Sequence, residues 1–190
     1  MKITNTNTGI LHMAQMGMLG AISIVLVALI RIPIVPAVPF LVYDMADAPI
    51  IIAALLFGTV PSLLILFIVS VIQAFLFGGN GWVGLLMHFI ASGALVAFVG
   101  QLYMRHHNLR DAVIGMVLGT IAMTAIMVPM NYIFTVQFFG TPKAVLDAIM
   151  LPGIVPFNLI KAGLNSLIAG VVFKALTPFI NKNRDIIRPA

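Results

Sequence analysis

Cysteine and glutamate are both absent from this chain of 190 residues. Without cysteine there is no disulfide, no thiolate metal site and no cysteine nucleophile. The acidic side chains are five aspartates, at positions 44, 47, 111, 147 and 185, and no set of aspartates and histidines has the spacing of a metal site. No glycine-rich phosphate-binding loop is present, so any use of ATP would require another polypeptide. The sequence predicts no catalytic residue, no metal and no cofactor.

Charged residues of either sign are scarce. They make up 8% of the chain, against about 25% in a soluble domain, whereas 62% of the residues are hydrophobic and the mean hydropathy is +1.16. This composition indicates an integral membrane protein surrounded by a lipid bilayer. No polar block is long enough for a separate soluble domain, so residues 1–190 are predicted to form one membrane domain. The net charge of +5 comes from basic residues scattered over loops and ends, which predicts no nucleic-acid partner.

Six apolar segments are predicted to be membrane helices, each of which needs about 20 residues to cross the hydrocarbon core. Prolines and glycines separate the segments, and the second segment is short. We therefore predict an all-α membrane protein, a bundle of about six transmembrane helices. The first segment lacks a small-residue cleavage pattern, so we expect it to be retained rather than removed as a signal peptide. The predicted spans are residues 13–30, 47–57, 62–78, 82–103, 112–134 and 154–180, with a turn at residues 58–61 and residues 135–153 as the last connection.

The basic residues predict the topology. An even number of spans places both termini on one side, and lysine and arginine concentrate on the cytoplasmic side. With both termini cytoplasmic, the outer side carries Arg31 and Lys143, alongside Asp44, Asp47 and Asp147. The inner side then holds Lys2, Arg105, Arg110, Lys174, Lys182, Arg184 and Arg188. We expect both termini in the cytoplasm and the proline-rich connection 31–39 outside.

Polar residues inside the last apolar segment predict a ligand site. Asn158, Lys161 and Asn165 are spaced by three and four residues, so they share one helix face. An ionisable group within a membrane helix is costly and usually marks a ligand site or a pathway. Asn131 lies at a comparable depth in the preceding span, where it could also satisfy backbone disturbed by Pro129. Lys161 has no acid partner in its own span, which argues against an intrinsic proton relay.

The outer connection is rich in aromatic and acidic residues. Phe40, Tyr43 and Asp44 are candidates for hydrogen bonding or packing against a ligand, or for tying down the loop. Asp47, directly before Ala48-Pro49, is predicted to be a helix N-cap.

Histidines in this chain are predicted to have structural or solvent contacts. His88 is interpreted as an interior histidine with satisfied hydrogen bonds, rather than as a metal ligand. His106 and His107 fall in a basic loop and are expected to be solvated.

Small residues recur in the first span at Gly17, Gly20 and Ala21. Such spacing lets a second helix approach closely, which favours helix association in lipid. The neighbour can be another protein or another helix of this chain. A scaffold protein, whose polar residues only bridge helices, is the alternative interpretation of the same residues.

Three motifs carry a resemblance to a known family. They are the outer segment Tyr43-Asp44-Met45-Ala46-Asp47-Ala48-Pro49, residues 118–124 with Asn131-Tyr132, and residues 153–161, which contain Asn-x-x-Lys. Through them the chain resembles the S components, the substrate-binding subunits, of energy-coupling factor (ECF) vitamin transporters, particularly the riboflavin-type branch.

The resemblance implies a six-helix protein of the bacterial plasma membrane that captures a vitamin from outside. It implies docking on a membrane coupling protein and two cytoplasmic ATPase subunits. Asn131, Asn158 and Lys161 would then line the pocket, and Gly17 and Ala21 would contact the coupling protein.

The chain departs from the riboflavin-type pattern in its third span and its outer loop. Leu66, Val69 and Ser70 stand where that branch has an acidic residue and a Lys-Asn pair, and Val42 replaces a polar loop residue. The pocket wall is therefore less polar. Pantothenate, whose carboxylate could pair with Lys161, remains open beside riboflavin, as does another B vitamin.

Overall fold

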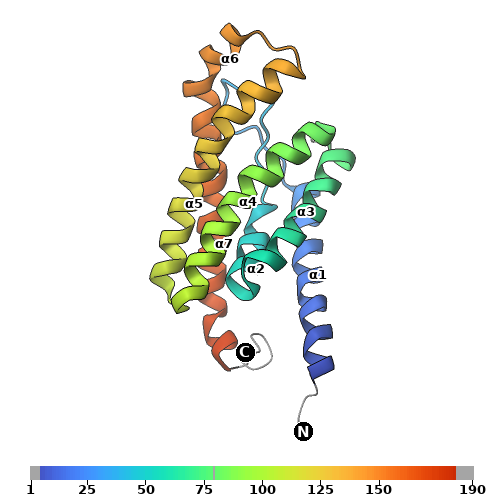
Figure 1. The fold of residues 1–190 in the computed structure, drawn as a ribbon, viewed down its shortest axis with the longest axis vertical. Helices are drawn as coiled ribbons and strands as arrows, with labels where there is room; N and C mark the ends of the chain where they lie inside the picture. Colours follow the sequence, from blue (N-terminus) through green and yellow to red (C-terminus); the bar gives the residue numbers. More distant parts are fainter. Residues whose placement is uncertain (1–4, 79, 183–190) are drawn as a thin grey trace.

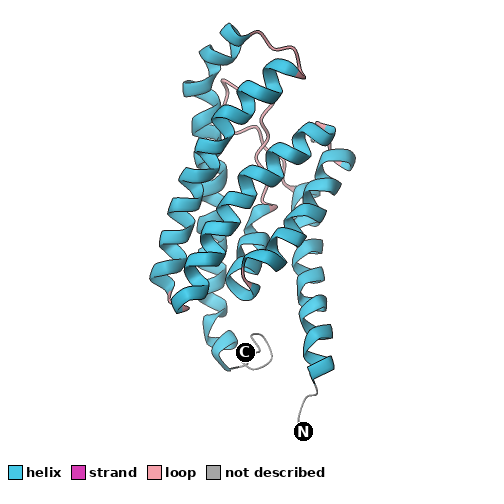
Figure 2. Cartoon of the chain, viewed as in Figure 1, coloured by secondary structure: helices cyan, strands magenta, loops and turns pink. Residues whose placement is uncertain are grey.

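The computed structural model describes residues 5–78 and 80–182 and places most of them in helices (Figures 1 and 2). Lys2, Arg184 and Arg188, which contributed to the predicted topology, lie outside these residues, as do both ends of the predicted 1–190 domain. The described residues contain no strand, and their one β-bridge pairs Ile32 with Tyr43. The elements are α1 (Asn5–Leu29), α2 (Asp47–Phe57), α3 (Thr59–Leu76), α4 (Gly81–His106), α5 (Leu109–Met130), π-helix η1 (Asn131–Thr135), α6 (Lys143–Ile149), π-helix η2 (Met150–Ile154) and α7 (Val155–Lys182).

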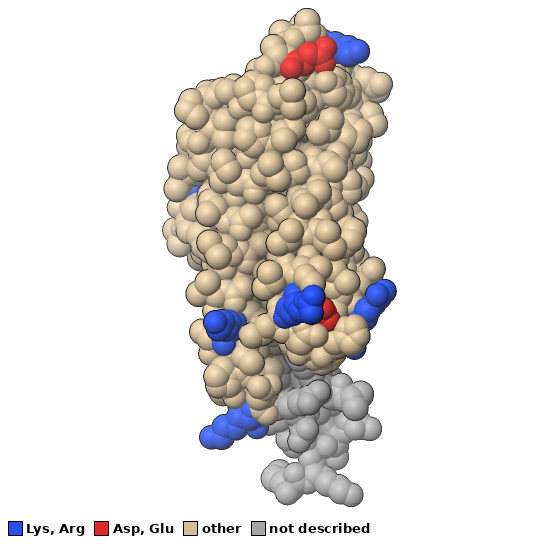
Figure 3. Space-filling model, turned by 90° about the vertical axis from the view of Figure 1, so that its left-hand side faces the viewer, with Lys and Arg blue, Asp and Glu red and all other residues tan. Residues whose placement is uncertain are grey.

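Five helical segments of the described chain are long and apolar enough to cross a membrane, and α2 is a shorter apolar helix. The prediction of an all-helical membrane bundle is therefore confirmed, while the side on which the termini lie stays a prediction. In Figure 1, α1 begins and α7 ends at the same end of the bundle. Figure 3 shows lysine and arginine gathered near that end, an uncharged surface above them, and a few charges at the opposite end.

Helix α2 lies at the centre of the bundle. Residues 48–57 are all apolar, and every residue from Asp47 to Leu55 is buried. Its neighbours are α1, α3, α4 and α7, so a helix that is hydrophobic on all sides is enclosed on all sides. Its 11 residues rise about 16 Å, roughly half of a hydrocarbon core of about 30 Å. The other half of this path is taken by the connection between α1 and α2.

That connection, residues 30–46, runs between the helices rather than over them (Figure 1). The Ile32–Tyr43 bridge closes it with N–O distances of 3.0 and 2.8 Å, and two further backbone bonds form turns around Val38. Val35, Val38 and Tyr43 pack with Leu146, Met150, Ile154 and Phe157. Irregular backbone at membrane depth is tolerated where it is buried in protein or lines a cavity. The packing of this loop against residues 146–157 meets that condition.

The predicted connection 135–153 is wrong in its second half, because residues 143–154 are helical. Pro152 lacks an N–H group, and its ring would clash with a carbonyl in a regular α-helix. The π-helix η2 accommodates it, as local π geometry does in other membrane helices. Helix α6 thus continues through η2 into α7, and in Figure 1 it lies at the end of the bundle opposite the termini.

Candidate functional site

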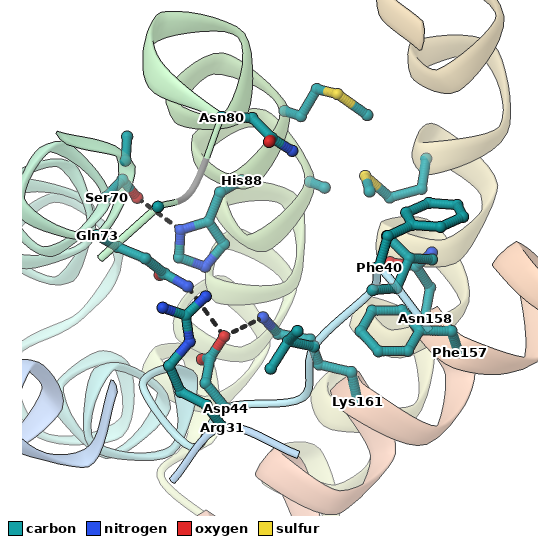
Figure 4. Close-up of a pocket in the computed structure, with 18 of the residues that line it drawn as sticks. Arg31, Phe40, Asp44, Ser70, Gln73, Asn80, His88, Phe157, Asn158 and Lys161 are labelled. Atoms are coloured by element: carbon teal, nitrogen blue, oxygen red, sulfur yellow. Dashed lines mark hydrogen bonds and ion pairs between the residues drawn. The ribbon is translucent and has the colours of Figure 1, made fainter. Parts of the chain in front are cut away.

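A cavity of about 170 Å³ is lined by α3, α4, α5, α7 and the 30–46 loop (Figure 4). Figure 4 shows Asp44 between Gln73 and Lys161, with Phe40, Phe157 and Asn158 grouped on another side of the cavity. Its wall mixes apolar, sulfur and aromatic groups with converging polar side chains. The polar lining residues are Arg31, Asp44, Ser70, Gln73, Asn80, His88, Asn158 and Lys161.

An ion pair between Asp44 and Lys161 forms one wall of the cavity. Lys161 Nζ lies 2.7 Å from Asp44 Oδ2, and both side chains are buried. A buried charge without a partner is costly, and the attraction within the pair offsets part of that cost. The partner comes from the loop, 117 residues away in sequence, so Lys161 is not the isolated cation that its own span suggests.

Asp44 also receives hydrogen bonds from other parts of the chain. Gln73 Nε2 of α3 donates to its Oδ2 at 2.9 Å, and the backbone N–H of Ala46 donates to its Oδ1 at 3.2 Å. Asn165 Nδ2 of α7 donates to the Asp44 carbonyl oxygen at 3.0 Å. Asp44 therefore joins the loop to α3 and α7 in one buried network, which fixes the carboxylate independently of any ligand.

Asp47 makes a second connection, from the start of α2 to α4. His88 Nε2 and Ser92 Oγ each lie 3.1 Å from a carboxylate oxygen of Asp47. The N-cap prediction for Asp47 is wrong: Asp47 is the first helical residue, Ala46 occupies the cap position, and no side-chain cap bond forms. The carboxylate is used by α4 instead, because two donors face it there.

His88 has hydrogen-bond partners on both ring nitrogens, as expected for an interior histidine. Its Nδ1 lies 2.9 Å from Ser70 Oγ, and its Nε2 faces Asp47. A carboxylate only accepts, so Nε2 donates, and in the neutral ring Nδ1 accepts the Ser70 hydroxyl proton. The hydrogen-bonded series Ser70–His88–Asp47 contains the same three residue types as the catalytic triad of a serine hydrolase. Ser70 lies inside α3, however, where neighbouring N–H groups serve the helix rather than an oxyanion.

Two of the predicted site residues, besides the ion pair, line the cavity. Asn158 Nδ2 donates to the Ile154 carbonyl at 2.8 Å, and its Oδ1 has no hydrogen-bond partner among the described residues. Phe40 lies at the cavity on the loop tip and is 62% exposed. An amide oxygen and an exposed ring are groups that a ligand can engage.

Tyr43 and Asn131 are not among the cavity's lining residues within the described chain. Tyr43 is buried at the Ile32 bridge. Asn131 is buried as well, donating to the Met127 carbonyl at 2.8 Å and accepting from Thr135 at 3.0 Å. These are bonds within its own helical segment, and Met127 O is not the carbonyl that Pro129 leaves free, which is that of Ala125. A ligand role for either residue stays a prediction.

Gln73, Arg31 and Asn80 line the cavity and were not predicted. Gln73 Oε1 is buried without a hydrogen-bond partner among the described atoms, so it can accept from a ligand. Gln73 lies three residues after Ser70 in an otherwise apolar span, and this spacing was the available signal. Of the departures noted in the sequence, Leu66 and Val69 are buried in the core, whereas Ser70 and Val42 reach the cavity.

The small residues of α1 divide between two faces. A Cβ added to Gly20 would lie 3.5 Å from Ile65 of α3, so Gly20 packs within the chain. Gly17 and Ala21 are exposed, and nothing lies within 4 Å of a Cβ built on Gly17. The outward face suits an approaching helix, although contact with a partner remains a prediction.

His106 and His107 are exposed, as predicted. The ring of His106 pairs with Asp111 at 2.7 Å, and His107 stacks on Tyr103. Both lie at the end of the bundle opposite the cavity.

Comparison with known proteins gives a consistent result. The sequence model of the family described as "ECF transporter, substrate-specific component" matches residues 11–173. The riboflavin transporter FmnP of Bacillus subtilis (strain 168) is 28% identical over 155 residues, covering 77% of this chain and 82% of that protein. The riboflavin transporter RibU of Streptococcus thermophilus is 28% identical over 157 residues, covering 75% and 72%. RibU of Staphylococcus aureus is 26% identical over 149 residues, covering 75% and 78%.

A solved structure described as the S component of a bacterial ECF transporter has the same fold. It aligns with a TM-score of 0.77 and 25% sequence identity, over 89% of this chain and 96% of that one. The residues matched by the family model, 11–173, include every residue that lines the cavity.

Proposed function

Because this chain belongs to the family of ECF transporter substrate-specific components, and is a multi-pass transport protein of the bacterial membrane rather than an enzyme, we propose that it captures riboflavin. The observation that carries this proposal is the buried Asp44–Lys161 pair beside Asn158 in the cavity. The pair makes this wall polar without leaving a net charge. Relatives named riboflavin transporters support the same ligand.

The paired lysine favours riboflavin over pantothenate. The carboxylate of pantothenate would have to displace Asp44 from Lys161, and Asp44 also accepts from Gln73 and Ala46. The displaced carboxylate would lose charge-assisted bonds in a buried setting. Riboflavin carries hydroxyl groups and a flat ring system without a net charge, so it can bind beside the intact pair.

The other lining groups suit a flat heterocycle. Phe40 and Phe157 offer aromatic surface, and Met123 and Met127 offer polarisable surface that adapts to a ring. The Asn158 amide can both donate and accept at a ring edge.

The cavity volume of about 170 Å³ is below the range of about 300–1,000 Å³ that ligand pockets usually have. We infer that the exposed loop tip around Phe40 moves outward to admit the vitamin. Asp44 and Asp47 stay bonded to α3, α4 and α7 during this movement. The tip of the 33–49 connection then closes over the bound ligand.

Release into the cell would follow docking on a membrane coupling protein and two cytoplasmic ATPase subunits. The exposed face of α1 that carries Gly17 and Ala21 is the proposed contact with the coupling protein. The chain has no phosphate-binding loop of its own, so the ATPases would supply the energy for reorientation.

Thermal unfolding of the detergent-solubilised protein with a panel of B vitamins tests this proposal. A ligand that binds only the folded state adds about 2.7 kcal/mol at 100 times its Kd. We expect riboflavin to raise the unfolding temperature without ATP and pantothenate to leave it unchanged. Stabilisation by pantothenate alone would contradict the ligand assignment. If no vitamin raised the unfolding temperature, the result would favour a scaffold protein whose polar residues only bridge helices.

A further inference from the structure

A second hollow lies on the membrane-facing side of the bundle, between α5 and α7. It is a groove of about 570 Å³ whose wall is almost entirely apolar. Six of the side chains that line it are large, apolar and 42–63% exposed: Leu109, Val113, Val117, Ile121, Leu167 and Val171. The vitamin cavity has none of these residues in its wall. In a membrane protein such a groove faces acyl chains rather than water.

The groove has one basic end. Lys174 is exposed, lines the groove, and has no ion-pair partner among the described residues. Arg110 is also exposed and lies one helical turn before Val113, on the same side of α5. Among the described residues, the acid near this end is Asp111, and it faces His106 and Asn108 instead. The free positive charge of this end is therefore not neutralised within the described chain.

The dimensions match one lipid chain. From Leu109 to Ile121 helix α5 rises about 18 Å, close to the half-thickness of about 15 Å of a hydrocarbon core. The floor is open in the middle, because nothing lies within 4 Å of a Cβ built on Gly163. In Figure 3 most of the basic side chains lie near one end of the molecule, and a broad uncharged surface separates them from the few charges at the other end. A phosphate at that end and an acyl chain along the groove would match this pattern.

We propose that the α5–α7 groove binds an anionic phospholipid, with one acyl chain along the groove and its phosphate at Lys174 and Arg110. Basic pockets between membrane helices bind anionic head groups through this combination of charge and apolar contact. The lysine stem can lie along the groove while its ammonium group reaches the phosphate. The proposal does not depend on the identity of the vitamin.

Native mass spectrometry of the delipidated, detergent-solubilised protein, titrated with phosphatidylglycerol or phosphatidylcholine, tests it. We expect the wild type to retain phosphatidylglycerol preferentially. Lys174→Gln should weaken the binding of phosphatidylglycerol about five-fold, which is the effect of one basic residue near an anionic surface. It should leave the binding of phosphatidylcholine unchanged. Lys143→Gln, an exposed lysine at the other end of the molecule, is the matched control.

A second variant tests the acyl chain. Gly163→Leu adds a side chain into open space in the groove and should weaken the binding of both lipids at least about five-fold. Gly17→Leu also adds a side chain into open space, but on another helix, and should leave the binding of both lipids unchanged. Equal lipid retention by wild type, Lys174→Gln and Gly163→Leu would overturn the proposal. So would an equal effect of Lys143→Gln and Lys174→Gln, because that would indicate unspecific attraction to net charge.

Discussion

Asp44 and Lys161 are each costly to bury and are stable in this fold only as a pair. Their 2.7 Å contact lies where the loop, α3 and α7 meet. Removing one member of a buried pair typically costs about 3–5 kcal/mol, because it leaves the other charge unpaired. Replacing both members can cost much less. The two charges therefore serve folding of the loop as well as the chemistry of the cavity.

The Asp44→Asn variant should consequently be less stable than the double variant Asp44→Asn/Lys161→Met. We expect the single change to lower the free energy of unfolding by about 3–5 kcal/mol and the second change to restore most of it. Thermal unfolding in one detergent without ligand measures both. A double variant no more stable than the single one would show that the unpaired lysine is not the cause.

The positions of some site residues could be predicted from the sequence, and those of others could not. Asn158 and Lys161 were predictable because helical spacing alone puts them on one face. The Asp44–Lys161 pair was not, because an irregular loop has no period from which its path can be inferred. Asp47 was misread because the local Asp-Ala-Pro signal for a cap competes with the tertiary donors His88 and Ser92. Whether Asn131 and Tyr43 touch a ligand stays a prediction.

The positions of the helices in the sequence follow mainly from the lengths of the apolar segments, whereas the path of the loop depends on a few close contacts. The six apolar segments predicted α1 to α5 and α7. Helix α6 and η2 were not predicted, because the prolines and glycines of this segment indicated a loop. In the structure, π geometry accommodates Pro152 without ending the helix. The loop packs against η2 at Gly153. A Cβ on Gly153 would lie 2.5 Å from Val38 Cγ1, so only glycine lets the loop approach this closely.

Gly153→Ala should displace Val38 and, with it, the loop that closes the cavity. We expect a loss of about 1–3 kcal/mol in the free energy of unfolding, typical of overpacking, together with weaker riboflavin binding. Adding Val38→Ala should restore both, because the remaining Val38 Cβ contact of 3.5 Å is ordinary. Thermal unfolding and flavin titration measure the two effects.

Gly163→Ala is the matched control for Gly153→Ala, because its added methyl group meets no atom within 4 Å. If Gly163→Ala were as damaging as Gly153→Ala, the loss would reflect helical glycine in general rather than the contact with Val38.

The whole molecule is polarised along its long axis. The cavity beside Asp44 and Lys161 lies toward one end. On the side of the molecule that Figure 3 shows, most lysine and arginine side chains lie near the other end. The distribution of lysine and arginine predicts that the basic end is cytoplasmic, which would open the cavity toward the outside. A helical bundle has the same packing in either orientation, so packing alone does not fix the topology.

Single cysteines test the orientation cleanly, because the chain has none of its own. Thr141→Cys lies in the connection before α6, and Asn108→Cys in the turn between α4 and α5. A membrane-impermeant maleimide should label Thr141→Cys in intact cells and Asn108→Cys only after permeabilisation. The reverse pattern would place the cavity on the cytoplasmic side and rule out capture from outside.

The central claim is that the cavity containing Asn158 and the Asp44–Lys161 pair holds riboflavin. Its most direct test is a flavin fluorescence titration of the purified protein, without ATP or partner subunits, comparing wild type with Asn158→Ala and with Lys143→Gln as a surface control. The account predicts tight binding by wild type and Lys143→Gln, and at least a ten-fold weaker Kd for Asn158→Ala, which loses a hydrogen-bonding amide. Equal affinity of wild type and Asn158→Ala would contradict it.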